Sequence, residues 1–454
     1  MTARRDRPRE AALELLRAVR EDDAYANLVM PQLVRPMDTR DAGLATELAY
    51  GTLRWQGWYD AVLRQCVTRP WAKVEPGLVD VLRLGAHQLL AMRVPDHAAV
   101  TSSADLARGL GARPDADARA GFVNAVLRKV ASLDAEAWAQ VIRGDRADDD
   151  VAWLAERWSH PLWIVRALRD SLGARRSELA DLLAADNNAA RPSLAARPGR
   201  MTIDELLAEP GVEAGRWSPI AGTLVAGAPE GLDCVRDRRA GVQDEGSQLV
   251  ALALTRAQVD GQEARWLDMC AGPGGKAAIL EGVAAQRGVE LTAVEQHAHR
   301  ADLVSASLAP DSSTVVLVGD ARHAPWGDAL FDRILLDAPC TGLGALRRRP
   351  ESRWRRTPAD LATLGALQRD LLRAGLDALR PGGVLAYVAC SPHLAETEFV
   401  ISDVLKDRTD VLQEDAHALL QEVDDCGDGL AVQMWPHRHG TDAMFLAVLR
   451  KLPS

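Results

Sequence analysis

Apolar residues recur at helical spacing along the first third of the chain. Ala11, Leu15 and Val19 share one face of a helix, and the same three- and four-residue spacing returns in later segments as far as Val130. Prolines separate these segments from one another. The pattern therefore predicts an all-α bundle over residues 1–133, in which no group of side chains indicates a chemical activity.

A polar, acidic stretch over residues 134–150 follows the bundle and is expected to be a linker. The pattern then becomes mixed, with a helix expected over 163–172, a strand over 192–197 and a second helix over 203–207. These short elements, separated by turns, predict a small α+β module over residues 150–235.

From residue 236 onward, short apolar runs alternate with longer helical stretches. Strands are expected at 265–269, 290–294, 314–318, 331–336 and 383–388. Because a helix fits between successive strands, these strands are expected to run parallel in a doubly wound sheet. Two later strands, at 430–435 and 444–449, have too little chain between them for a crossover and are expected to pair as a hairpin.

Five parallel strands followed by a hairpin resemble the layout of class I S-adenosylmethionine-dependent methyltransferases. The fold class expected for residues 236–454 is therefore a Rossmann-like α/β domain with a seven-stranded sheet. The helical domain and the small α+β module would precede it.

The composition is typical of a folded, soluble protein of several domains, with 454 residues, 47% hydrophobic and 26% charged. No run approaches the ~18 apolar residues of a membrane helix. The charged N-terminus lacks the apolar segment of a secretory signal, so a cytoplasmic protein without membrane contact is expected. The six cysteines are scattered, with no CxxC pair and no histidine cluster. Neither a disulfide framework nor a metal site is therefore expected.

One segment departs from the net charge of −10, which by itself disfavours general binding of nucleic acid. Residues 347–356 contain six arginines and a tryptophan, with a single acid. Guanidinium groups bind phosphates, and both side-chain types stack on bases. An RNA contact is expected here, with a solvated helix face as the alternative. The expected contact residues are Arg347, Arg348, Arg349, Arg353 and Trp354.

Two cysteines follow apolar runs that read as strands. Cys340 closes the sequence Asp337-Ala338-Pro339-Cys340, and Cys390 lies in Ala389-Cys390-Ser391. Because the carboxyl ends of strands in an open α/β sheet share one crevice, both thiols are expected to meet a ligand there. One thiol that attacks a ring and one that helps to release it suit carbon methylation of a pyrimidine.

A glycine-rich turn follows the first expected strand of this domain. Its residues are Cys270, Ala271, Gly272, Pro273, Gly274, Gly275 and Lys276. Such a turn lets a ligand approach the backbone amides at the start of the next helix. Glu295 ends the second strand, where an acid accepts hydrogen bonds from ribose hydroxyls. Asp320 ends the third and is a candidate for an adenine amino group, although either acid alone could be an ordinary strand-end residue.

Taken together, these motifs resemble the RNA 5-methylcytosine methyltransferases, specifically the Sun/Fmu type that modifies 16S ribosomal RNA. The resemblance covers residues 190–454, and the arginine run resembles the arginine-rich loop of that family. The N-terminal helices, with Gly121–Arg128, resemble the NusB-like RNA-binding domain of this subfamily. The positions that match the family's site motifs are Leu267–Lys276, Glu295, Arg300, Asp320, Asp337–Cys340 and Ala389–Ser391.

This resemblance implies methyl transfer from S-adenosylmethionine to carbon 5 of a cytosine in RNA, through a covalent bond between Cys390 and carbon 6. Cys340 would assist the release of the product, and Asp337 would stabilise the ring during addition. The glycine-rich turn, Glu295, Arg300 and Asp320 would bind the cofactor, together with Asp337. A monomer that binds RNA and not DNA is expected.

Three other functions compete with this interpretation. A non-catalytic RNA-binding protein with a relict methyltransferase domain is disfavoured by the intact cysteines and acids. A nicotinamide-dependent oxidoreductase is disfavoured by the glycine spacing, which is not G-x-G-x-x-G. DNA methylation is disfavoured by the second cysteine motif and by the resemblance of the N-terminal part to an RNA-binding domain.

Overall fold

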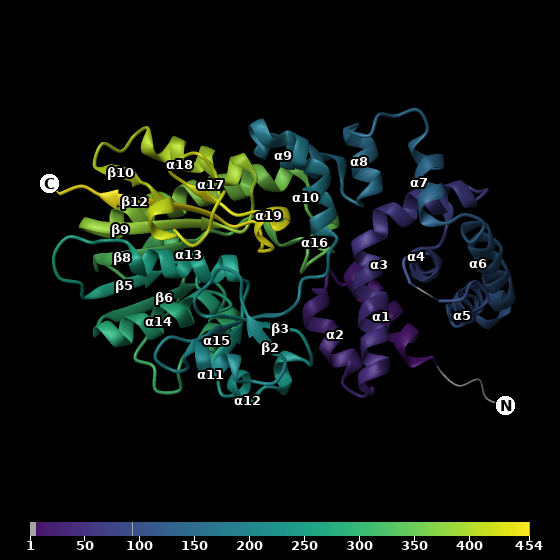
Figure 1. Cartoon of the computed structure of the whole chain (residues 1–454), viewed down its shortest axis with the longest axis horizontal. Coiled ribbons are helices and arrows are strands. Elements are labelled where there is room, and N and C mark those ends of the chain that lie inside the picture. Colours follow the sequence, from purple (N-terminus) through teal and green to yellow (C-terminus); the bar gives the residue numbers. More distant parts are fainter. Residues whose placement is uncertain (1–5, 93, 454) are drawn as a thin grey trace. The chain divides into compact units, whose positions relative to one another are not determined.

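The computed structural model describes residues 6–92 and 94–453, and the chain divides into two units (Figure 1). The helical unit comprises Met1–Asn188 together with Leu346–Arg355. The sheet unit comprises Ala189–Ala345 and Arg356–Ser454. In the described part of the chain, no helix has the length and apolarity needed to cross a membrane.

This division differs from the expected one, because the segment 150–235 is split between the units. Its helices before residue 188 join the helical unit, where Trp153 packs edge-on against Trp58 in a common core. Its strands join the sheet unit, where Gln248 donates a hydrogen bond to the backbone oxygen of Leu194. The chain thus forms two units where three parts were expected, and the boundary between the units near residue 188 lies inside the expected α+β module.

The helical unit is all α, as predicted, in its described residues. Its helices are α1 (Arg7–Glu21), α2 (Ala26–Val34), α3 (Thr39–Cys66), α4 (Pro76–Leu90), α5 (Asp96–Arg108), α6 (Ala116–Val130), α7 (Ala135–Arg143), α8 (Val151–Arg157), α9 (Leu162–Ser171), α10 (Leu179–Asp186) and α16 (Ser352–Arg355). The long helix α3 supplies two apolar clusters, Leu48 and Leu53 to one and Val62 and Leu63 to the other. The helices α1, α2, α4, α6, α7 and α8 all contact α3.

A small antiparallel sheet opens the sheet unit, in the order β2-β3-β1-β4. Its elements are β1 (Ser193–Ala196), α11 (Ile203–Leu207), β2 (Val212–Ala214), β3 (Ala221–Leu224), α12 (Asp233–Arg236) and β4 (Ala240–Val242). The strand and the helix expected at 192–197 and 203–207 are both confirmed. Thr202 caps α11 in a capping box with Glu205, which explains why that helix starts where the sequence predicts.

The large sheet has the order β10-β12-β9-β8-β5-β6-β7, with β11 paired to β12 beside this path. Its strands are β5 (Arg265–Asp268), β6 (Glu290–Glu295), β7 (Val315–Val318), β8 (Phe331–Asp337), β9 (Leu379–Ala389), β10 (Val411–Glu414), β11 (Val432–Gln433) and β12 (Phe445–Lys451). The five expected parallel strands and the antiparallel pair of β11 and β12 are confirmed. The eighth strand, β10, was not expected, and it pairs antiparallel with β12.

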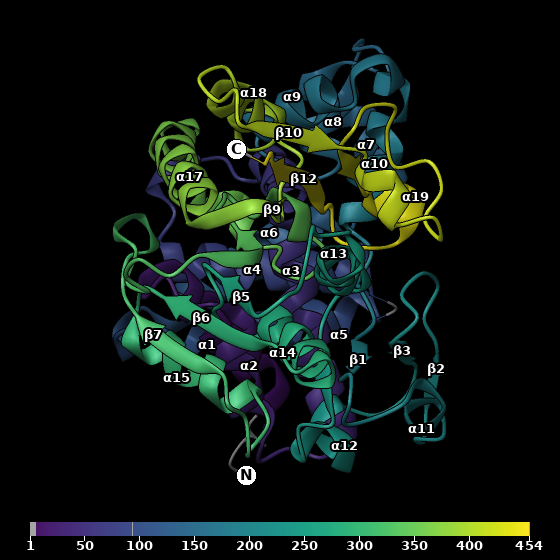
Figure 2. The ribbon, with the colours of Figure 1, turned by 90° about the vertical axis from the view of Figure 1, so that its left-hand side faces the viewer.

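Helices cover both faces of this sheet and create two apolar cores. On one face, α13 (Glu245–Arg256) and α14 (Gly275–Arg287) pack over residues such as Trp266 and Leu335. On the other face, α17 (Pro358–Ala378) and α18 (Glu398–Leu405) pack over Leu336 and Tyr387. Figure 2 shows α14 and α15 (Ala298–Ser307) running beside β6 and β7. Burial on both faces explains why the inner strands are continuous apolar runs.

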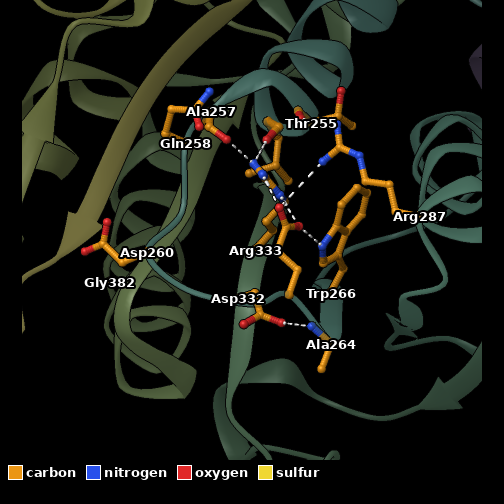
Figure 3. Close-up of polar contacts among 12 residues, drawn as sticks. Thr255, Ala257, Gln258, Asp260, Ala264, Trp266, Arg287, Asp332, Arg333 and Gly382 are labelled. Atoms are coloured by element: carbon orange, nitrogen blue, oxygen red, sulfur yellow. Dashed lines mark hydrogen bonds and ion pairs between the residues drawn. The ribbon is translucent and has the colours of Figure 1, made fainter.

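A buried arginine ties the amino-terminal side of the large sheet together (Figure 3). Arg333 of β8 is 3% exposed and pairs with both carboxylate oxygens of Glu263, at 2.7 and 2.8 Å. The Nη1 atom of Arg333 donates to the backbone oxygens of Leu254 and Ala257 at 2.5 and 2.6 Å. The indole of Trp266 donates to the same Glu263 at 2.8 Å. This network anchors α13 and the loop after it to β8, while the candidate site lies at the opposite ends of the strands.

Candidate active site

The carboxyl ends of four neighbouring parallel strands carry the expected chemistry. Asp268 ends β5, Glu295 ends β6, Asp337 ends β8, and Cys390 directly follows β9. The register places Asp337 opposite Val388, and Asp268 opposite Leu335. Because these strands run parallel, their last residues converge at one edge of the sheet. The structure therefore brings together side chains that lie up to 122 positions apart in the sequence.

The two expected cysteines are in contact. The Sγ atoms of Cys340 and Cys390 are 3.2 Å apart, and both side chains are half-buried. Backbone hydrogen bonds fix the two loops, because Ala338 donates to Val388 and Gly344 donates to the carbonyl of Cys390, each at 2.9 Å. These backbone hydrogen bonds between the two loops therefore hold the two thiols close together.

The surroundings of the two thiols are electrostatically different. The hydrogen bond with Cys390, burial and the charge of Glu396 together raise the pKa of Cys340 well above its usual value. Negative charge on Cys390 contributes to raising the pKa of Lys276, after the charge of Asp337 and its hydrogen bond. These surroundings favour the thiol form of Cys340, while the charge of Lys276 and negative charge on Cys390 attract each other.

Lys276 and Asp337 form a largely buried ion pair beside the thiols, with Nζ and Oδ2 2.7 Å apart. Burial lowers the pKa of Lys276, but the charge of Asp337 and its hydrogen bond outweigh burial, so the lysine pKa rises. Both members of the pair were expected in the site, although the sequence did not predict that they would contact each other. The lysine fixes the position of the Asp337 carboxylate next to Cys390.

The glycine-rich turn has the close backbone approach that a cofactor needs. A side chain at Gly272 would collide with Glu295 and Arg300, and Gly274 has a φ of 113°, which only glycine readily adopts. Arg300 donates to the carbonyl of Gly272 at 2.7 Å and lies 3.6 Å from the Glu295 carboxylate. The expected acid and arginine are thus both joined to this turn. Pro273 is exposed at its tip.

Asp268, just before this turn, lies within the matched motif Leu267–Lys276, but it was not among the expected cofactor-binding residues. It is fully buried, and neither of its carboxylate oxygens has a well-formed hydrogen bond within the described residues. Burial and the charge of Asp337 raise the pKa of Asp268 to about 7, and Lys276 and the Cys270 amide only partly oppose this. A buried acid without a full set of donors suits a cationic group of a ligand, such as the ammonium of S-adenosylmethionine.

Asp320 lies just beyond β7, where Gly319 donates to the backbone oxygen of Glu295 at 3.0 Å. Its carboxylate accepts hydrogen bonds from the backbone and guanidinium of Arg322, the shortest at 2.6 Å. The hydrogen bond from this guanidinium lowers the pKa of Asp320. Asp320 is therefore at the expected edge of the sheet, next to Glu295, as an ionised acid.

The arginine run has a different position from the one expected, because Leu346–Arg355 belongs to the helical unit. Arg353 is 0% exposed. Its guanidinium donates to Asn187 Oδ1 at 2.9 Å and to the backbone oxygens of Ser159, Arg54 and Asp186 at 3.0, 3.3 and 3.3 Å. Burial lowers its pKa to about 10 even though Asp186 favours the charged form. Arg353 is thus an internal anchor, which corrects its expected contact with RNA.

The rest of the run is divided between buried and exposed positions. Arg347 is buried, whereas Arg349 and Trp354 are exposed and Arg348 is half-buried. Arg355 pairs with Asp23 at 3.0 Å and lies 4.7 Å from the ring centre of Tyr25. Local sequence could not separate these classes, because the partners of the buried arginines lie far away along the chain.

Replacing Arg353 by alanine is expected to lower the free energy of unfolding of the helical unit by about 3–5 kcal/mol. The change removes a charged side chain that satisfies four buried acceptors. Arg349→Ala is the matched control and should cost less than about 0.5 kcal/mol, because Arg349 is exposed. Urea unfolding followed by tryptophan fluorescence measures both, and equal losses would contradict the anchoring role.

No cluster of histidine, cysteine and acidic side chains that could hold a metal ion occurs in the described ranges. The donors at this edge of the sheet are instead two thiols, a lysine and several acids. These groups are suited to covalent and electrostatic chemistry.

Known proteins resemble the chain over its whole length. Residues 255–450 match the family described as 16S rRNA methyltransferase RsmB/F, and residues 6–132 match the NusB family. The putative methyltransferase MT1451 of Mycobacterium tuberculosis (strain CDC 1551 / Oshkosh) is 50% identical over 98% of this chain and 97% of its own. The probable ribosomal RNA small subunit methyltransferase B of Bacillus subtilis (strain 168) is 30% identical over 98% of both chains.

Solved structures show the same fold. The crystal structure of PH0851 superposes with a TM-score of 0.79, 22% identity and 99% coverage of both chains. A methyltransferase homologue from Pyrococcus horikoshii gives 0.56 with 22% identity over 67% of this chain and all of its own. The structural matches show the fold, and the sequence matches show the family. The chain belongs to the 16S rRNA methyltransferase RsmB/F family and carries a NusB-family domain.

Proposed function

We propose that this protein methylates carbon 5 of a cytosine in 16S ribosomal RNA through a covalent cysteine adduct. Family membership makes it a methyltransferase with S-adenosylmethionine as methyl donor. Relatives named for the ribosomal RNA of the small subunit support the RNA substrate. The observation that carries the proposed chemistry is the contact of two thiols, 3.2 Å apart, beside the ion pair of Lys276 and Asp337.

Covalent attack is needed because carbon 5 of cytosine is a weak nucleophile. When bound, S-adenosylmethionine supplies an electrophilic methyl group. The Cys390 thiolate, favoured by nearby Lys276, forms a bond to carbon 6, and the electron pair of the C5–C6 double bond becomes available at carbon 5. Asp337, held by Lys276, accepts a hydrogen bond from the base during this step. Carbon 5 then takes the methyl group.

Release requires that carbon 5 lose its proton and that the C6–S bond break. Once Cys390 is a neutral thioether, the negative charge that helps to keep Cys340 protonated is gone. Cys340 can then lose its own proton to water and accept the proton from carbon 5. The electrons of that C–H bond restore the double bond, and Cys390 leaves as a thiolate. The order of events follows from the coupling of the two thiols.

The target base must lie outside a stacked helix, because carbon 6 is otherwise inaccessible. Single-stranded loops of RNA meet this requirement at low energetic cost. The proposal therefore favours an unpaired or extruded cytosine as the substrate.

The proposal is tested by incubating the purified chain with 16S ribosomal RNA and S-adenosylmethionine, followed by bisulfite sequencing. One protected cytosine is expected, and none with Cys390→Ala. A methyl group found on any other atom of the RNA would overturn the assignment to carbon 5. A deletion strain that lacks the same protected cytosine would identify the natural position.

Arg348, Arg349 and Trp354 remain the proposed RNA-contact residues of the arginine run. Arg349→Gln is expected to weaken RNA binding and to flatten the dependence of log affinity on log salt by about one unit. The affinity for S-adenosylmethionine should not change, because Arg349 lies outside the sheet unit. Filter binding at several salt concentrations measures the slope. An unchanged slope would return Arg349 to the alternative of a solvated face.

A further inference from the structure

A buried carboxylate lies behind the two cysteines and is not explained by the steps above. Glu396 belongs to the short 3-10 turn Leu394–Glu396 that follows β9, and it is 0% exposed. Its side chain accepts a hydrogen bond from the backbone amide of Thr341 at 2.7 Å and another from the Thr341 hydroxyl. It also accepts one from the Ser391 hydroxyl at 2.6 Å. Three donors thus converge on one carboxylate inside the protein.

The positions of these donors are informative. Thr341 directly follows Cys340, and Ser391 directly follows Cys390. The two hydroxyl oxygens are themselves 3.4 Å apart. A single side chain therefore holds both cysteine-bearing loops, which are otherwise 50 positions apart in the sequence.

Glu396 is itself held firmly. Its backbone oxygen accepts a hydrogen bond from the buried hydroxyl of Tyr387 at 2.8 Å. Its backbone amide donates to the backbone oxygen of His393 at 2.8 Å. Gln368 of α17 donates to the backbone oxygen of Pro339 at 2.8 Å and also lies 3.5 Å from the Glu396 carboxylate. The carboxylate is thus a fixed point between β9, α17 and the loop of Cys340.

We propose that Glu396 is a positioning residue, which sets the separation of Cys340 and Cys390 through Thr341 and Ser391 and keeps Cys340 in its thiol form until the adduct exists. The inference rests on the proposed function, since it concerns the order in which the two thiols act. A buried carboxylate requires its donors, so movement of either loop would leave it unsatisfied. Displacements of about 1 Å in such a site cost roughly 100-fold in rate.

The charge of Glu396 has a second consequence. It is among the groups that raise the pKa of Cys340, after the hydrogen bond with Cys390 and burial. Glu396→Gln removes this negative charge while keeping the shape of the side chain. The thiolate of Cys340 should then form at a lower pH than in the parent protein.

The test uses the full chain and two measurements. Turnover of 16S ribosomal RNA by Glu396→Gln should fall about 100-fold with unchanged affinity for S-adenosylmethionine, which also reports on folding. In a Cys390→Ala background, the pH dependence of iodoacetamide labelling at Cys340, located by mass spectrometry, should move to lower pH with Glu396→Gln. Glu398→Gln is the matched control, because Glu398 is exposed two residues further on, and it should change neither measurement.

Ser391→Ala provides a second route if Glu396→Gln does not fold. It removes one donor and keeps the carboxylate, and turnover is expected to fall about tenfold. Lower turnover with unchanged labelling of Cys340 would reduce Glu396 to a purely structural role and overturn the proposal, as would wild-type turnover of Glu396→Gln. If instead Cys390→Ala kept full activity, the proposed function would fail, while the labelling of Cys340 would still decide the role of Glu396.

Discussion

Cys390→Ala is expected to abolish methylation of RNA, with turnover at least about a thousandfold below that of the parent protein. The charge of Lys276 favours negative charge on Cys390, whereas burial and nearby Asp268 raise the pKa of Cys270, and the hydrogen bond with Cys390 and burial raise that of Cys340. The binding of S-adenosylmethionine should persist, because the glycine-rich turn follows β5 and Glu295 ends β6, whereas Cys390 follows β9. Transfer of radiolabelled methyl groups and calorimetry measure the two properties separately.

The control for this result is Cys426→Ala. Cys426 is buried in the same unit, and its thiol donates to the backbone oxygen of Val423 and not to either of the paired cysteines. Normal turnover of Cys426→Ala shows that loss of a buried thiol alone is harmless. Turnover by Cys390→Ala above about a thousandth of the parent rate would argue that Cys390 is not the nucleophile.

The sequence was sufficient to predict the parallel strands and the meeting of the two cysteines. Runs such as Val384–Val388 are apolar without interruption because helices cover both faces of the sheet, and such runs have few alternatives to a buried strand. Once the strands are known to be parallel, the residues after them must share one edge. The contact of Cys340 with Cys390 follows from that geometry.

The sequence could not predict features that depend on distant partners. Arg353 reads like its neighbours in the arginine run, but its hydrogen-bond partners lie 166 or more positions away. Glu396 and Glu398 are equally polar in sequence, yet only Glu396 is buried against both cysteine loops. Strand β10 was missed because Val411 is its only buried residue, which leaves no alternating pattern.

Cys340→Ala is expected to trap a covalent complex between the protein and RNA. In the proposed mechanism, addition of Cys390 to carbon 6 and transfer of the methyl group do not require Cys340, whereas removal of the proton from carbon 5 does. Methylated RNA should therefore stay attached to Cys390 and migrate with the protein on denaturing gels. Turnover should fall about 100- to 10,000-fold, as for loss of a general base.

The double variant Cys340→Ala/Cys390→Ala identifies the sulfur that holds the RNA. It should give no complex, because the attacking thiol is gone, while Cys340→Ala alone gives one. The opposite pattern, in which Cys390→Ala traps RNA and Cys340→Ala does not, would exchange the two roles. Two observations support the proposed roles: Lys276 and negative charge on Cys390 attract each other, whereas the hydrogen bond with Cys390, burial and the charge of Glu396 raise the pKa of Cys340. In the proposed mechanism, Cys390 attacks as a thiolate, and Cys340 loses its own proton only after the adduct has formed, so that it can then accept the proton from carbon 5.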